Sequence, residues 1–300
     1  MYTATRRPGR MYLSICAGKC RCLVRRAAAL LAALALMLWA GTVPAAESPA
    51  RIVTLAPHLT ELVYAAGAGP LLVGTVNSSD YPPQSRSLPR LGDGLQLDPE
   101  SLLALKPTLV LGWQSAPLDA LRPLLDSLHI RTALFYPRRL ADLPATVRAI
   151  GKLAGTQAQA DTAAAQMEQR INHLATIQGT PVRAVIEISD APLYVVGNDP
   201  ILNDMLGHCG AHNLYAGALP AAPQINAETL LVDQPDVIIV GTADPAALEL
   251  RRRALADLGL LAARQGHVIG VDPDILFRPG PRLIDAAEQL CSRLAKARKP

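Results

Sequence analysis

An acid and a guanidinium flank three large apolar residues near the C-terminus, in the segment PDILFRPGPR at residues 273–282. Asp274 precedes the apolar run ILF, which ends at Phe277, and Arg278 follows it. The prolines and glycine that come next do not continue a helix, so we expect a loop here and a helix only from Arg282. Loops are usually polar because their backbones lie in water. The question is what this apolar run faces, if not water.

Aromatic residues make up only 4% of the chain, so their positions are informative. Trp113 ends the apolar run TLVLGW, Tyr81 follows an acid in SSDYPP, and Tyr194 follows SDAPL. With Phe277, these rings lie where strands are expected to lead into helices, and together they can line a pocket for a large, flat, partly apolar ligand. The alternative is that some of them close the ends of hydrophobic cores, above all Phe277 and Trp113.

Common enzyme motifs are absent from the sequence: G-x-S-x-G, H-E-x-x-H, the phosphate-binding G-x-x-x-x-G-K-[S/T] and G-x-G-x-x-G. The segment HCGAH at 208–212 has a spacing that a metal site can use, but Gly210 favours a helix end and Cys209 is needed for a disulfide. His58, in APHLTEL, lies where a strand turns into a helix. It can face a cleft and coordinate a metal carried by a ligand, although a loop-capping histidine is the favoured interpretation. We therefore expect neither an enzyme nor a metal site built by the protein itself.

Residues 1–45 are typical of an export signal. A basic pair, Arg25 and Arg26, leads into AAALLAALALMLWAG and then into small residues, so cleavage is expected after Ala45 or Ala46. The apolar run is short for a membrane span of about 20 residues. An uncleaved anchor is the alternative. The segment predicts export, and the family resemblance described below implies the periplasm.

Charge and cysteine content both change once this segment is removed. It holds seven basic residues and no acid, so the remainder has 22 Lys and Arg against 25 Asp and Glu. This excess of acids removes the electrostatic argument for a nucleic-acid partner. Only Cys209 and Cys291 remain, which in an exported chain favours one disulfide over two buried free thiols.

The rest of the chain alternates short apolar runs with helical patterns, which predicts an α/β fold of two lobes with largely parallel sheets. We expect a first lobe at 51–138 and a second at 182–298. Between them, residues 139–178 are rich in Ala, Gln and Leu, and predict one long helix with a potential break near Gly151–Gly155.

One sequence unit occurs twice. ESLLALKPTLVLG begins at Glu100 and ETLLVDQPDVIIVG begins at Glu228. Each copy has a helical start, a proline seven residues after the Glu, and then an apolar strand. Repetition on both sides of the linking helix indicates two similar lobes, and ligands bind at the carboxyl ends of the strands of such lobes.

These segments resemble the periplasmic binding proteins whose Rossmann-like lobes are joined by a single long backbone helix (class III), and among them the branch that binds vitamin B12 for bacterial ABC importers. The pieces that carry the resemblance are TLAPHLTELVYAAG, SSDYPP, ALKPTLVLGW, LGHCGAHNLY, the Glu228 unit and DILFRPGPRLIDAAEQLC. The resemblance covers almost all of the chain from Arg51 onward.

The resemblance implies a role for several residues. Trp113, Tyr194, Asp274 and Arg278 correspond to residues that contact the corrin ligand, and Cys209 and Cys291 to a disulfide pair. Glu100 and Glu228 correspond to one glutamate per lobe, and each glutamate docks on arginines of the two membrane subunits, which form a two-fold dimer. Their alternative role is structural: an acid in the first turn of a helix interacts favourably with the helix dipole. No permanently bound cofactor is implied, and we expect a monomer when the protein is free.

The chain departs from the pattern of the cobalamin branch at three aromatic positions, which hold Ser78, Gly94 and Ala222. Each lost stacking partner removes about 0.5–1.5 kcal/mol beyond burial. We expect cobalamin or a related corrinoid as the ligand, with Asp274 and Arg278 bonding to its polar rim and the apolar run facing it. Haem or a ferric siderophore is the alternative, with His58 or the tyrosines at 81 and 194 as iron ligands.

Overall fold

The computed structural model describes residues 49–94, 97–113, 115–174 and 180–297. The predicted signal peptide at 1–45 therefore lies outside the described residues. No helix among the residues described is long and apolar enough to cross a membrane. The described residues between 49 and 297 form one compact unit.

The first lobe is built on a parallel sheet with the strand order β2-β1-β3-β4. Its strands are β1 (Ile52–Thr54), β2 (Leu72–Gly74), β3 (Leu109–Gly112) and β4 (Arg131–Leu134). Neighbouring residues of a strand pack into different cores: Leu109 and Leu111 contact one hydrophobic cluster, and Val110 contacts another. The central strands are thus buried on both faces, which explains their continuous apolar sequences.

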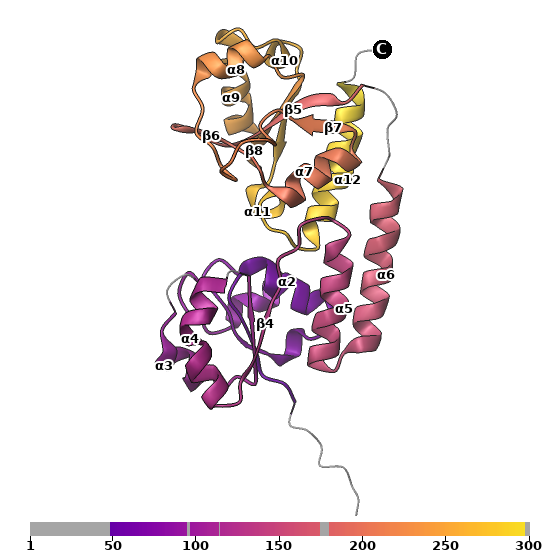
Figure 1. The fold of residues 1–300 in the computed structure, drawn as a ribbon. Helices are drawn as coiled ribbons and strands as arrows, with labels where there is room; N and C mark the ends of the chain where they lie inside the picture. The colour runs from indigo at the N-terminus through magenta and orange to yellow at the C-terminus, as the bar shows by residue number, and fades with distance from the viewer. Residues whose placement is uncertain (1–48, 95–96, 114, 175–179, 298–300) are drawn as a thin grey trace, which may run out of the picture. The chain divides into compact units, whose positions relative to one another are not determined.

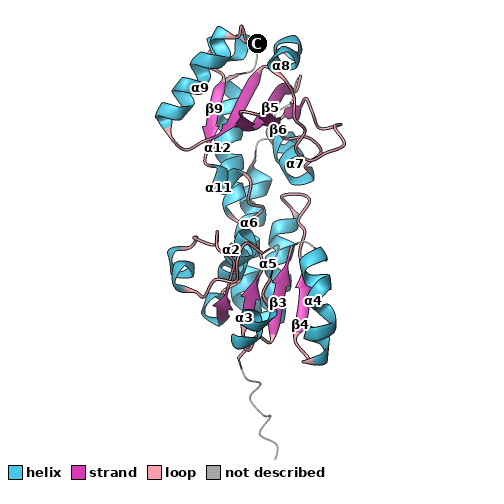
Figure 2. Cartoon of the chain, turned by 90° about the vertical axis from the view of Figure 1, so that its left-hand side faces the viewer, coloured by secondary structure: helices cyan, strands magenta, loops and turns pink. Residues whose placement is uncertain are grey.

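The second lobe repeats this arrangement with the order β6-β5-β8-β9, and β7 also pairs with β5. Its strands are β5 (Val182–Asp190), β6 (Leu193–Val195), β7 (Ala211–Asn213), β8 (Val237–Gly241) and β9 (Val268–Val271). Only β6 is antiparallel to its neighbour among the strands described. Parallel strands need crossover connections, and helices supply them here (Figure 2). The prediction of an α/β fold with two lobes is confirmed.

Helices cover both sheets (Figure 1). In the first lobe they are α2 (Pro57–Ala65), α3 (Pro99–Ala104), α4 (Ser115–Ser127) and α5 (Asp142–Ala154), with short 3-10 turns at Gly69–Leu71 and Pro83–Ser87. Helix α6 (Gln157–His173) follows. The second lobe adds α7 (Pro200–His208), α8 (Ala227–Asp233), α9 (Pro245–Asp257), α10 (Leu261–Arg264), α11 (Pro273–Leu276) and α12 (Arg282–Lys296).

The segment 139–178 differs from the single helix that the sequence predicted. Gly155 has a φ of +77° and ends α5, and α6 begins two residues later and packs back along α5 (Figure 1). A left-handed conformation favours glycine, so the break falls at the position where the sequence allowed one. Helix α6 alone leads to the second lobe, where Arg170 bonds to Glu288 and Asp285 of α12.

The duplicated unit has the same local structure in both lobes. Glu100 and Glu228 lie in the first turns of α3 and α8, where Asp98 and Asn226 accept hydrogen bonds from backbone N–H groups as N-caps. Both helices then end at a non-glycine residue with positive φ just before the proline, Lys106 at 48° and Gln234 at 43°. Such a conformation is uncommon outside glycine, so its occurrence at matching positions supports a true internal repeat.

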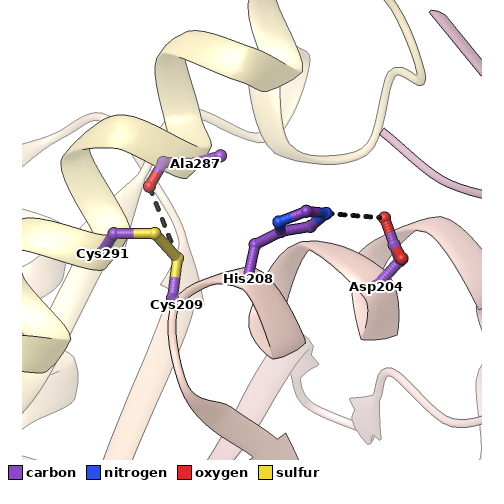
Figure 3. The surroundings of a disulfide bond; sticks show 5 residues. All are labelled: Asp204, His208, Cys209, Ala287 and Cys291. Carbon is purple, nitrogen blue, oxygen red and sulfur yellow. Dashed lines mark hydrogen bonds and ion pairs between the residues drawn. A yellow bond between two sulfur atoms is a disulfide. The ribbon is translucent and has the colours of Figure 1, made fainter. Parts of the chain in front are cut away.

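A disulfide joins Cys209 at the end of α7 to Cys291 in α12, as predicted, with the two Cα atoms 4.4 Å apart (Figure 3). The rest of the HCGAH segment is structural as well. Gly210 has a φ of +63° at the helix end, and His208 Nε2 lies 3.7 Å from Asp204 Oδ2 (Figure 3). Strand β7 follows directly. The disulfide therefore fixes the last helix to the body of the second lobe.

Candidate functional site

The two sheets direct the carboxyl ends of their strands to the junction of the lobes. In the first lobe the chain order reverses between β1 and β3, and in the second between β5 and β8. Ligands of parallel sheets bind outside the carboxyl ends of the strands at such reversals. His58 follows β1 and Trp113 follows β3, whereas the Phe277 ring covers the end of β8 so closely that a Cβ at Gly241 would lie 2.8 Å from it.

A cavity of about 110 Å³ lies between these two edges. The first lobe contributes two aromatic residues, and the second contributes the start of α7 and the segment around α11. The lining residues are Trp113, Tyr136, Pro137, Asp199, Pro200, Ile201, Leu202, Leu276, Phe277 and Pro279. The side chain of Asp199 caps α7, where it accepts a hydrogen bond from Leu202 N at 3.0 Å. The cavity lining is therefore mostly apolar, with Trp113 and Tyr136 from one lobe and Phe277 from the other.

Trp113 is the centre of the aromatic wall. Its ring stacks on Tyr136 with centroids 6.1 Å apart and planes at 28°, and it meets His58 edge-on at 5.3 Å. The sequence analysis missed Tyr136, which is 55% exposed. A signal was present: Tyr136 lies two residues after the end of β4, the parallel neighbour of β3, so it lies at the same edge as Trp113.

His58 is buried behind this wall and is neutral. Only 3% of the residue is exposed, and desolvation together with the nearby positive charge of Arg278 lowers the pKa of its imidazole to about 3. Its Nε2 has no hydrogen-bond partner among the described residues, and neither has the buried Nε1 of Trp113. The sequence placed His58 at the cleft; the structure places it against Trp113, and its role as an axial ligand stays a prediction.

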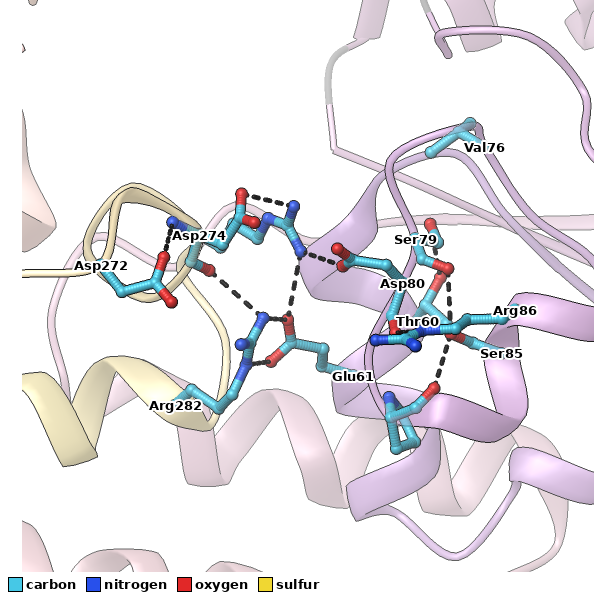
Figure 4. A network of polar contacts seen from close by, with 12 residues as sticks. Thr60, Glu61, Val76, Ser79, Asp80, Ser85, Arg86, Asp272, Asp274 and Arg282 are labelled. Carbon is cyan, nitrogen blue, oxygen red and sulfur yellow. Dashed lines mark hydrogen bonds and ion pairs between the residues drawn. The ribbon is translucent and has the colours of Figure 1, made fainter. Parts of the chain in front are cut away.

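Arg278 lies in a cluster of charges that joins the lobes. Figure 4 shows its neighbours Glu61, Asp80, Asp274 and Arg282. The guanidinium of Arg278 donates to Asp80 at 2.7 Å in the first lobe and to Asp274 at 2.6 Å in α11. Beside it, Arg282 donates twice to Glu61, at 2.9 and 2.6 Å. Asp274 and Arg278 thus bind protein groups here, whereas the sequence analysis expected them to bond to the rim of a ligand.

Burial and charge act in opposite directions on the acids of this cluster. Desolvation raises the pKa of Glu61, although the hydrogen bond and charge of Arg282 oppose it. Burial also acts to raise the pKa of Asp80, but the hydrogen bond and charge of Arg278 hold it below its usual value. Asp80 is therefore ionised at neutral pH, and its bond to Arg278 is charge-assisted.

The apolar run that follows Asp274 is partly helical, and its residues face different surroundings. Residues 273–276 form the short helix α11, so the expectation of a loop is wrong there; Asp272 caps the helix by accepting a bond from Asp274 N. Leu276 is buried but reaches the cavity wall, and Phe277 lines the cavity. Ile275 instead lines a groove of about 290 Å³ between α9, β9 and α12.

The remaining predicted site residues lie apart from the cavity. Tyr81 is 43% exposed, and the guanidinium of Arg282 lies 4.2 Å above its ring. Tyr194 lies on β6 opposite Ser189 and lines none of the three cavities found among the described residues. Their ligand contacts remain predictions. Glu100 and Glu228 are both exposed, one on each lobe.

The positions that depart from the aromatic pattern are open to solvent or sterically restricted. Ser78 and Ala222 are exposed. Gly94 has a φ of +86°, and a Cβ there would lie 2.5 Å from the backbone oxygen of Leu55. No side chain fits at Gly94 without a backbone shift, so a recess remains next to Trp113.

Comparison with known proteins now adds to this geometry. A profile of the periplasmic binding protein family matches residues 52–275, which is most of the chain. The chain belongs to this family. Its curated relatives include the vitamin B12-binding protein of Pectobacterium atrosepticum, 32% identical over 257 residues, which are 83% of this chain and 89% of the relative. The vitamin B12-binding protein of Vibrio cholerae is 31% identical over 251 residues, or 83% and 90% of the two chains.

Solved structures of the family agree with the fold. The periplasmic vitamin B12 binding protein BtuF of Vibrio cholerae superposes with a TM-score of 0.76 at 30% identity, covering 84% of this chain and 99% of BtuF. The periplasmic haem-binding protein RhuT from Roseiflexus sp. RS-1, in its apo form, gives a TM-score of 0.71 at 25% identity, with 83% and 99% covered. Family membership confirms the expected class of fold, and these relatives are periplasmic binding proteins.

Proposed function

We propose that this chain is a periplasmic receptor that captures a corrinoid, most directly cobalamin, between its lobes and delivers it to the membrane subunits of an ABC importer. The observation that carries the proposal is the cavity at the two strand edges, where the Trp113–Tyr136 wall of one lobe faces Phe277 of the other. A flat macrocycle can contact aromatic surface on both sides there. Relatives named as vitamin B12-binding proteins at 31–32% identity support the same ligand class.

Haem is the second candidate, because RhuT is named as a haem-binding protein and has a similar fold. A haem receptor commonly needs an iron ligand in its cleft. The candidate residues are poorly placed to bind iron, since Tyr81 lies under Arg282, Tyr194 lies outside the cavity lining, and the free nitrogen of His58 is buried. A corrinoid brings its own cobalt ligand and does not depend on these residues, so it is favoured.

Visible spectroscopy tests the proposal. The mature chain, beginning after Ala46, is mixed with cyanocobalamin or with haemin, and free ligand is removed by gel filtration. We expect a retained corrin spectrum; a retained Soret band with no corrin band would favour haem instead. Titration calorimetry then compares the wild type with Trp113→Ala and Arg278→Ala, both of which should bind more weakly. Unchanged affinity in both variants would place the ligand elsewhere.

Delivery to a transporter is the second part of the proposal. Glu100 and Glu228 are exposed acids on duplicated helices, a pseudo-symmetric arrangement that suits basic residues on a two-fold permease. Residues 1–45 serve as the export signal in this proposal. The protein acts by binding and release without catalysis, and it is a monomer until it docks.

A further inference from the structure

Four buried hydroxyl groups of the first lobe lie together, next to the loop that carries Asp80. They belong to Thr54, Thr60, Thr75 and Ser79, and each of these residues is fully buried, with 0% exposed. The three threonine oxygens lie 2.7–2.9 Å from one another, and Ser79 Oγ lies 2.7 Å from that of Thr75. Because a hydroxyl can both donate and accept, every member of this hydroxyl cluster has a hydrogen-bond partner within it.

The hydroxyl cluster joins segments that are separate in the chain. Thr54 ends β1, Thr60 lies in α2 and Thr75 directly follows β2, whereas Ser79 lies in the loop just before Asp80. Apolar side chains of similar shape would fill the same space without the cost of burying hydroxyls. A buried polar network whose members are all paired instead makes one arrangement rigid. The cluster therefore fixes the loop relative to the strands and to α2.

The backbone of the loop is held from its other side (Figure 4). The carbonyl oxygen of Ser79 accepts hydrogen bonds from Ser85 Oγ at 2.9 Å and from the guanidinium of Arg90 at 2.8 Å. The carbonyl oxygen of Asp80 accepts one from Arg86 Nε at 3.0 Å. Side-chain and backbone contacts thus fix the chain immediately before and at Asp80, which limits the directions in which its carboxylate can point.

The Asp80 carboxylate reaches across to the second lobe and holds Arg278. It accepts a hydrogen bond from one terminal nitrogen of this guanidinium at 2.7 Å, and Asp274 accepts one from the other at 2.6 Å. The side chain of Arg278 is only 13% exposed, and the residue directly follows Phe277, which lines the ligand cavity. A guanidinium held by two carboxylates is already ordered, so less conformational freedom is lost when a ligand contacts it.

We propose that the hydroxyl cluster and Asp80 are positioning residues for the ligand contact of Arg278. The hydroxyl cluster fixes the loop, the loop directs Asp80 at Arg278, and Asp80 holds the guanidinium in the orientation that the ligand meets. The inference rests on the proposed function, in which Arg278 contacts the corrinoid. It adds residues of the first lobe that act on this contact without lying in the ligand cavity.

Removing the charge of Asp80 is the first test. Asp80→Asn keeps the size of a side chain that is 48% exposed, so the variant should fold. Calorimetry should show cyanocobalamin binding about five- to tenfold weaker than in the wild type, because the charge-assisted bond to Arg278 is lost. Asp119→Asn is the matched control: it breaks a pair with Arg122 of similar length, 2.8 Å, at an acid that is 52% exposed and outside the cavity lining. It should bind normally, and normal binding by Asp80→Asn would overturn the inference.

Removing one hydroxyl of the cluster is the second test. Thr75→Val should weaken cyanocobalamin binding about three- to tenfold, and Thr75→Ser, which keeps the hydroxyl, should restore it to within about twofold of the wild type. Thr146→Val is the control for stability, since this buried threonine donates to the backbone oxygen of Asp142 at 2.8 Å in α5. It should lower stability toward urea but leave binding unchanged. If Thr75→Val does not fold, Ser79→Ala removes the neighbouring hydroxyl instead.

The double variant Thr75→Val, Asp80→Asn separates positioning from general destabilisation. If Thr75 acts through Asp80, the double variant should bind cyanocobalamin within about twofold of Asp80→Asn alone. Losses that multiply, normal binding by the hydroxyl variant, or an equal loss in Thr146→Val would overturn the inference. A wild type that binds no cyanocobalamin would overturn the proposed function itself, whereas a wild type that binds it no better than these variants would overturn only the positioning role.

Discussion

Arg282 donates two hydrogen bonds to Glu61 across 221 residues of sequence, and so joins the start of α12 to α2. Both side chains are largely buried, with 15% and 2% exposed. A continuous hydrophobic cluster runs through the same junction, from Leu59 through Ile171 to Leu290. The two lobes are therefore connected by charge as well as by apolar packing.

Arg282→Met should lower the free energy of unfolding by about 3–5 kcal/mol, because the buried Glu61 carboxylate loses both hydrogen bonds from Arg282 and keeps a longer contact of 4.0 Å with Arg278. Arg170→Met is the control. Arg170 pairs with Glu288 and Asp285, but the side chains of this cluster are 39–44% exposed, so its loss should cost about 0–1 kcal/mol. Urea unfolding of the three proteins measures both values. Equal losses of unfolding free energy in the two variants would contradict the expectation that the buried pair contributes more than the exposed one.

Acidification should destabilise the fold through His58. Its pKa is about 3 in the folded state and 6.5 in the unfolded state, so the unfolded chain binds the proton as the pH falls below 6.5. The contribution of His58 to the free energy of unfolding is therefore at its full value above pH 6.5. It decreases by about 1.4 kcal/mol per pH unit as the pH falls from 6.5 toward 3. His58→Phe keeps a ring against Trp113 but cannot take a proton. The difference in stability between the two proteins, measured by urea unfolding from pH 7 to pH 5, should therefore change by about 2 kcal/mol; a constant difference would show that His58 does not titrate as described.

Loss of the disulfide should destabilise the second lobe. The bond between Cys209 and Cys291 closes a loop with a sequence separation of 82 residues, and removing it raises the entropy of the unfolded chain. We expect the double variant Cys209→Ala, Cys291→Ala to lose about 2–4 kcal/mol of unfolding free energy. A reducing agent should lower the melting temperature of the wild type and leave that of the double variant unchanged. A wild type that is insensitive to reduction would contradict this expectation.

Tyr136 should contribute to ligand affinity through its ring. It stacks on Trp113 and lines the cavity, so Tyr136→Ala should weaken cyanocobalamin binding by about three- to tenfold. Tyr136→Phe keeps the stacking surface and should bind within twofold of the wild type. Calorimetry measures both. A comparable loss in Tyr136→Phe would assign the effect to the hydroxyl group instead of the ring.

Glu100 and Glu228 should matter for uptake and leave binding unchanged. Both are exposed and neither lines the cavity beside the aromatic wall, so Glu100→Arg and Glu228→Arg should each bind cyanocobalamin with wild-type affinity. In cells that lack their own receptor, uptake of labelled cyanocobalamin should fall at least tenfold with either variant, because the new charge repels a basic docking surface. Asp126→Arg, at an exposed acid on α4, is the control and should support normal uptake. Normal uptake with both glutamate variants would refute the docking role.

The sequence predicted elements whose signal is local. The apolar runs around Leu109 and Ile238 indicated buried parallel strands, and the duplicated Glu100 and Glu228 units indicated two related lobes. Residues at strand ends were placed correctly at the lobe edges, as Trp113 shows. These inferences succeeded because the burial of a strand, and the edge at which a parallel strand ends, follow from residues that are neighbours in sequence.

Other features depended on distant residues and could not be seen in local patterns. The contact of Arg278 with a ligand stays a prediction, and its bond to Asp80, 198 residues away in sequence, was not foreseen. The sequence indicated that the helix can break near Gly155. That the chain turns there, with a left-handed φ, so that α6 packs back along α5, depends on contacts between the two helices. Tyr136 was overlooked because its stacking on Trp113 depends on the pairing of β3 with β4.

The amino-acid sequence by itself determined the α/β class, the repeated lobe and the identity of the two cysteines that pair, because periodicity and composition encode burial along one chain. Tertiary structure alone decided which side chains share a space. It placed Trp113 between two cavities, buried His58 beside it and set Glu61 against Arg282. Such contacts arise from the docking of separate elements, whose relative positions depend on the whole core and on no single segment.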